Sequence, residues 1–114
     1  MKNLLVALTF SLISTASFAT TVNCVGTEPF WSVRTDGKVL MYSDPVSRTR
    51  PMPITSVTQA AGFADGFAFI VKTKTTRLTV IAGQCSDGMS DETYTHHTVY
   101  EMGKTVLAGC CNML

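Results

Sequence analysis

Residues 67–82 read FAFIVKTKTTRLTVIA, two runs rich in β-branched and aromatic residues on either side of Lys74-Thr75. In each run large apolar residues alternate with other residues, and a period of two is the pattern of a β-strand with one buried face. A two-residue connection between two such runs predicts an antiparallel hairpin. The predicted core stripes are Phe67, Phe69 and Val71 in the first run and Leu78 and Val80 in the second.

The same pattern recurs along the chain, and no segment has the apolar spacing of a convincing helix. Asp36-Gly37 is one of the best hairpin signals, because both residue types favour the tight turns that join antiparallel strands. Residues 44–53 contain Pro45, Pro51 and Pro53. Each proline removes a ladder donor, so this segment is predicted to be a loop or an edge crossing rather than a central strand. The other predicted strands are 30–34, 38–43, 54–59, 93–102 and 104–108.

Seven or so short strands joined mainly by hairpins predict an all-β fold. The two architectures that fit are a small antiparallel meander closed into a barrel and a two-layer sandwich.

The first 19 residues, Met1–Ala19, have the order of a secretory signal peptide. Lys2 supplies a positive charge, an apolar run extends from Leu4 to Ile13, and small residues stand at Ser17 and Ala19. The run is too short for a transmembrane helix, which needs roughly 20 apolar residues. We therefore expect residues 20–114 to form a single exported β domain, periplasmic or secreted, with no membrane span.

The chain has four cysteines, and in an exported protein of this size they predict two disulfides that staple the domain. Cys110 and Cys111 are neighbours whose side chains point to opposite faces of an extended segment, so each can reach a different partner. We favour Cys85–Cys110 with Cys24–Cys111, and the swapped arrangement is the close alternative. Asn23 is a poor residue to precede a lipidated cysteine, so Cys24 is interpreted as a disulfide partner.

The charge balance argues against nucleic acid as a partner. The chain has nine basic and eight acidic residues, and one of the basic residues, Lys2, lies in the predicted signal peptide. A net charge near zero with no dense basic run offers little to neutralise a phosphate backbone.

Two segments hold unusual residues outside the clear strand interiors. Residues 26–31 read Gly-Thr-Glu-Pro-Phe-Trp, and residues 85–91 read Cys-Ser-Asp-Gly-Met-Ser-Asp, followed by Tyr94 and the late pair Gly109-Cys110. This combination resembles a group of poorly characterised bacterial envelope proteins, many of which are predicted lipoproteins. The resemblance implies a cell-envelope location and a fold, but no activity. The chain departs from the group in lacking a convincing lipidation motif.

Trp31, the only tryptophan, could form the floor of a pocket or plug one end of a barrel. In the second segment Asp87-Gly88 and Ser90-Asp91 are turn residues that bond their own backbone. A disulfide at Cys85 would make this polar loop rigid, which lowers the ordering cost of binding. The predicted binding residues are Glu28, Phe30, Trp31, Ser86, Asp87, Ser90, Asp91 and Tyr94.

An enzyme is disfavoured, because Ser86 and Ser90 lack a nucleophile-elbow motif around them. We expect a non-enzymatic module that binds an envelope protein or a small ligand, without a cofactor. One concrete version is inhibition of a cell-wall hydrolase such as lysozyme, by analogy with small disulfide-bonded inhibitor barrels. The alternatives are a copper- or zinc-binding protein that uses His96 or His97 with methionines, and a structural envelope component.

Overall fold

The computed structural model describes residues 21–47 and 49–114, and the predicted signal peptide Met1–Ala19 lies outside them. The described residues form eight strands that follow one another around a closed barrel. The strands are β1 Thr21–Thr27, β2 Phe30–Asp36, β3 Val39–Ser43, β4 Arg50–Gln59, β5 Ala68–Thr73, β6 Thr76–Ser86, β7 Thr93–Met102 and β8 Thr105–Met113.

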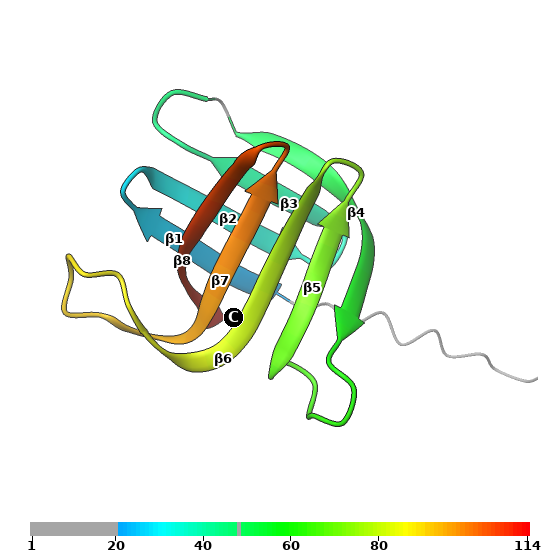
Figure 1. Ribbon diagram of the computed structural model, residues 1–114. Coiled ribbons are helices and arrows are strands. Elements are labelled where there is room, and N and C mark those ends of the chain that lie inside the picture. The colour runs from blue at the N-terminus through cyan, green and yellow to red at the C-terminus, as the bar shows by residue number, and fades with distance from the viewer. Residues whose placement is uncertain (1–20, 48) are drawn as a thin grey trace, which may run out of the picture.

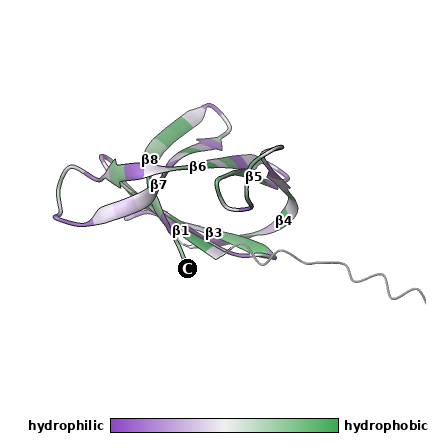
Figure 2. Ribbon diagram, turned by 90° about the horizontal axis from the view of Figure 1, so that it is seen from below, coloured by the Kyte–Doolittle hydropathy of each residue, from purple (hydrophilic) through white to green (hydrophobic). Residues whose placement is uncertain are grey.

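Every strand pairs antiparallel with its neighbours in the chain, and β1 also pairs with β8 to close the sheet. The meander barrel predicted from the sequence is therefore confirmed, and the sandwich alternative is wrong. In Figure 1 strands β1 to β3 run across strands β5 to β7, and Figure 2 shows the two sets on opposite sides of the interior. The described residues contain no helix that is long and apolar enough to cross a bilayer.

Strand β1 was not predicted, and β8 extends five residues beyond its predicted end at Ala108. Asn23 and Gly26 disfavour a strand by composition. Burial overrides this preference, because Val22 and Cys24 face the core with no exposed surface. The two strands form because each is the pairing partner that the other needs to close the barrel.

The prediction that residues 44–53 avoid the sheet is wrong for their last four residues, because β4 begins at Arg50. Pro51 and Pro53 pair with β3, while the pairing of β4 with β5 starts only at Ile54. The backbone N–H of Ile54 donates to Lys38 on the β3 side, so the nitrogens of Pro51 and Pro53 face the side that has no strand there. The two prolines therefore remove no ladder hydrogen bond.

A stack of aromatic rings runs through the core. The ring of Tyr100 lies 6.0 Å from that of Trp31 and 5.9 Å from that of Tyr42, and all three side chains are buried. Four of the five predicted stripe residues are buried as expected, namely Phe69, Val71, Leu78 and Val80. The fifth, Phe67, precedes β5, is partly exposed, and stacks on Phe63 in the β4–β5 loop instead of facing the core.

The two disulfides have the favoured pairing, Cys24–Cys111 and Cys85–Cys110. Cys24 and Cys111 are directly opposite each other on β1 and β8, inside the barrel. Cys110 points the other way and joins β8 to the end of β6. The neighbouring cysteines thus serve the two faces of one strand, as the extended geometry predicted.

Candidate functional site

The hairpin formed by β6 and β7 bends where it leaves the barrel. The pairing shifts between Ala82 and Cys85, where two residues of β6 face one residue of β7. Such a bulge bends the strand and increases its twist. The bend brings the β6–β7 loop to the β1–β2 turn, where the Thr27 hydroxyl donates a 3.1 Å hydrogen bond to the Asp87 carbonyl oxygen.

A small apolar cluster holds the bent hairpin against the barrel wall. The Cys85–Cys110 disulfide and Tyr94 pack together with Val25 of β1. Cys85 and Cys110 are 5% and 2% exposed, so the crosslink is shielded from solvent. The loop beyond the cluster therefore starts from a fixed base.

The β6–β7 loop is organised around the carboxylate of Asp87. Its Oδ1 accepts hydrogen bonds from the backbone N–H groups of Ser90 at 2.8 Å and Met89 at 2.9 Å, and its Oδ2 accepts one from the Ser90 hydroxyl at 2.7 Å. These donors lower the pKa of Asp87 to about 2. The Tyr94 hydroxyl donates to Glu92 at 2.9 Å, which together with burial raises the pKa of Tyr94 to about 12.

An open pocket of about 490 Å³ lies between three segments that are distant in the sequence. These segments are the β1–β2 turn with its flanking strands, the end of β3, and the β6–β7 loop. The pocket is lined by Val25, Gly26, Thr27, Phe30, Trp31, Ser32, Ser43, Asp44, Pro45, Asp87 and Tyr94.

Trp31 belongs both to the core and to this pocket. Its side chain is 5% exposed, and it stacks on Tyr100 from the inside of the barrel. Gly26 is its cross-strand partner, and a Cβ atom at Gly26 would overlap the indole ring. A Cβ atom at Gly109 would lie 3.0 Å from the indole Cζ2. The two glycines therefore leave the space that the indole occupies.

Asp44 at the end of β3 resembles Asp87 in its surroundings. Its carboxylate accepts hydrogen bonds from the Tyr42 hydroxyl at 2.5 Å and from the backbone N–H groups of Val46 at 2.8 Å and Ser47 at 2.5 Å. These donors, the Tyr42 hydroxyl first, lower the pKa of Asp44. Both aspartates are therefore ionised at neutral pH, and the pocket lining contains no lysine or arginine.

The structure brings together four of the eight predicted binding residues, Phe30, Trp31, Asp87 and Tyr94, in this pocket. Ser86 lines an adjoining pocket of about 280 Å³, beside Cys85 and His97. Ser90 supports the Asp87 carboxylate instead of lining a pocket. Glu28 and Asp91 are exposed and lie outside the pocket lining.

Sequence reasoning missed the part of the pocket that β3 supplies. Ser43 ends a predicted strand, and Asp44 and Pro45 were interpreted only as the start of a loop. An aspartate before a proline signals a turn, but this local signal does not reveal that the turn faces Trp31. The pairing of β2 with β3, which sets Ser32 opposite Ser43, makes the connection.

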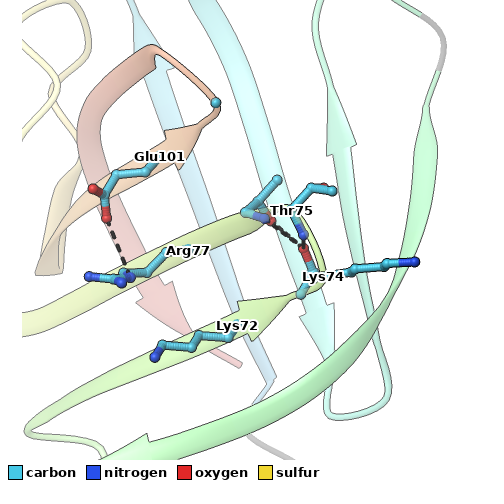
Figure 3. A pocket seen from close by; sticks show the side chains of 8 residues that line it. Lys72, Lys74, Thr75, Arg77 and Glu101 are labelled. Atoms are coloured by element: carbon cyan, nitrogen blue, oxygen red, sulfur yellow. Dashed lines mark hydrogen bonds and ion pairs between the residues drawn. The ribbon is translucent and has the colours of Figure 1, made fainter.

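A second pocket, of about 310 Å³, lies beside the β5–β6 hairpin and has a basic lining (Figure 3). Lys72 and Arg77 are cross-strand partners, and Arg77 forms a 3.7 Å ion pair with Glu101. Lys72 and Lys74 point away from each other, so these cations do not converge on one ligand.

The two adjacent histidines point to opposite faces of β7, as their sequence positions require. His96 is buried; its Nε2–H donates to the Gly66 carbonyl oxygen at 2.8 Å, and its Nδ1 lies 2.7 Å from the Thr95 hydroxyl. Across residues 21–47 and 49–114, no group of three His, Cys, Asp or Glu side chains could hold a metal ion. The alternative of a copper or zinc site made by one histidine with methionines stays a prediction.

Comparison of the chain with protein-family models, curated proteins and solved structures finds no match. The resemblance to bacterial envelope proteins stays a prediction.

Removal of the Cys85–Cys110 disulfide tests whether this crosslink holds the β6–β7 hairpin against the barrel. We expect the variant C85S/C110S to lose roughly 3.5 kcal/mol of stability on the chain-entropy account, while C24S/C111S, which opens a longer loop, loses roughly 4.6 kcal/mol. Only the first variant should lose amide-exchange protection mainly in residues 83–95. Unchanged protection there would show that the disulfide does not order the loop.

The hydrogen bonds to the Asp87 carboxylate predict that the β6–β7 loop becomes less stable in acid. Its pKa is about 2 in the folded chain and near 3.9 in an unfolded one, so the ionised form stabilises the folded loop above about pH 4. This contribution is lost as the pH falls from about 4 to 2. The amide NMR signals of Met89 and Ser90 should titrate with the Asp87 midpoint, and D87N should abolish the transition. A midpoint near 4 would contradict the hydrogen bonds described.

Proposed function

We propose that this chain is an exported, non-enzymatic β-barrel module that binds an envelope protein or a small ligand in the pocket beside Trp31. The two disulfides are typical of a protein that folds in an oxidising environment outside the cytoplasm. A periplasmic or secreted location is part of the proposal and agrees with the signal-peptide pattern of residues 1–19.

The observation that carries the proposal is the joining of both sequence motifs in one cavity. Phe30 and Trp31 come from the first motif, and Asp87 comes from the second. The loop that contributes Asp87 is held by a disulfide at its base and by hydrogen bonds within it. A concave site with apolar walls, a few polar groups and little freedom to rearrange is typical of ligand-binding sites.

Trp31 can report binding, because it is the only tryptophan and it lines the pocket. We expect its fluorescence to change saturably with at least one member of a panel of peptidoglycan fragments, acidic and basic dipeptides, and neutral disaccharides. Phe30 and Phe63 are 56% and 58% exposed, but Phe30 alone lines the pocket. F30A should therefore weaken binding several-fold and F63A should not. No response at millimolar concentrations of every member would refute the proposal.

A second candidate is inhibition of a cell-wall hydrolase, and the shape of the β6–β7 loop favours it. The loop projects from the barrel in Figure 1 and is braced by the Asp87 carboxylate. Inhibitors of clefted enzymes bind well when a rigid projecting loop enters the cleft, because little order is lost on binding.

Purified protein is expected to slow lysozyme near a stoichiometric ratio if this second candidate is right. Met89 at the loop and Val106 on β8 have matched exposures of 64% and 63%. M89A should then weaken the inhibition, whereas V106A should leave it unchanged. No slowing at a large excess of protein would exclude lysozyme as the target.

A further inference from the structure

The pocket beside Trp31 carries negative charge that none of the described residues lining it neutralises. Asp44 and Asp87 are its charged residues, and both are held in the ionised form by neutral N–H and O–H donors. Such donors stabilise a carboxylate without cancelling its charge. Arg50, at the far end of the β3–β4 loop, lines a separate pocket to which Asp44 also contributes, but among the described residues Arg50 and Asp44 form no ion pair. A ligand in the pocket beside Trp31 therefore meets a field that favours positive charge.

The hydrogen-bonding state of the carboxylates distinguishes between ligand classes. Oδ1 of Asp44 and Oδ1 of Asp87 each accept two hydrogen bonds from backbone N–H groups, which use both lone pairs of that oxygen. Oδ2 of Asp87 also accepts two hydrogen bonds, from the Ser90 and Tyr94 hydroxyls, whereas Oδ2 of Asp44 accepts one, from Tyr42. A neutral sugar therefore finds few free acceptors for its hydroxyl groups. A cation needs only proximity to the charge, because the Coulomb attraction requires no free lone pair. The arrangement thus favours a cation over a neutral sugar.

Aromatic surface lies beside this charge. Phe30 is 56% exposed although it begins β2, and Trp31 forms another part of the lining. The face of an aromatic ring attracts an ammonium or guanidinium group, and the ring also covers the methylene stem that carries it.

The indole N–H of Trp31 adds a hydrogen-bond donor to the lining. Its nitrogen lies against Gly26, and among the described residues no hydrogen bond uses it. A peptide carbonyl oxygen would complete this hydrogen bond, and every basic residue of a protein has one nearby.

We propose that the pocket beside Trp31 receives a lysine or arginine side chain of a partner protein, with the cationic group beside Asp44 and Asp87 and the stem against Phe30. This inference rests on the proposed binding function and names the chemistry of its ligand.

N-acetylarginine amide and N-acetylcitrulline amide provide a matched pair of probes, because they differ chiefly in charge. Titrated against Trp31 fluorescence, the arginine probe should bind roughly tenfold more tightly than the citrulline probe, and added salt should reduce this ratio. Because this comparison uses the unmodified protein, it stays decisive even if a variant fails to fold.

Charge-removing variants locate the effect. D44N should weaken binding of the arginine probe several-fold, and D65N, which removes the same charge from the β4–β5 loop, should not. F30L should also weaken binding, while F63L should leave it unchanged.

The outcomes separate this inference from the proposed function. Equal affinity for both probes would overturn the preference for a cation and leave the binding function standing. The preference would also fall if neither probe bound at concentrations at which another panel member did. If no panel member and neither probe changed the fluorescence of Trp31, both the cation preference and the proposed binding function would be overturned.

Discussion

The pairing of β1 with β8 is the contact on which the rest of the structure depends. It joins the two ends of the described chain over the register from Val22 opposite Met113 to Val25 opposite Cys110. Without it the sheet would have two open edges, which are prone to pair with other chains. The Cys24–Cys111 disulfide lies within this pairing, so a covalent bond secures the point where the barrel closes.

The Cys85–Cys110 disulfide fixes the base of the loop that lines one side of the pocket beside Trp31. Cys110 reaches Cys85 on the outside, next to the bulge that bends β6 and β7. The bent hairpin then lies close enough to the β1–β2 turn for Thr27 to bond the Asp87 carbonyl oxygen. One strand thus carries the bond that closes the fold and the bond that builds the pocket wall.

Asp44 and Asp87 connect local folding with the character of the pocket. Each carboxylate orders its own loop by accepting backbone N–H groups two and three residues ahead. The same bonds keep each carboxylate ionised beside the aromatic surface of Trp31. Residues that look like ordinary turn formers in the sequence therefore set the electrostatics of the site, because two separate turns meet across one cavity.

The sequence by itself determined the features that depend on neighbours in the chain. Alternation in residues 67–82, the Asp36-Gly37 turn and the opposite faces of Cys110 and Cys111 were enough for an all-β meander with two disulfides, whereas the structure decided between the two pairings that remained. Only the tertiary structure decided that the sheet closes into a barrel, that Pro51 lies in a strand, and that Asp44 shares a pocket with Trp31. These outcomes depend on contacts between segments far apart in the chain, and local propensity carries no information about such contacts.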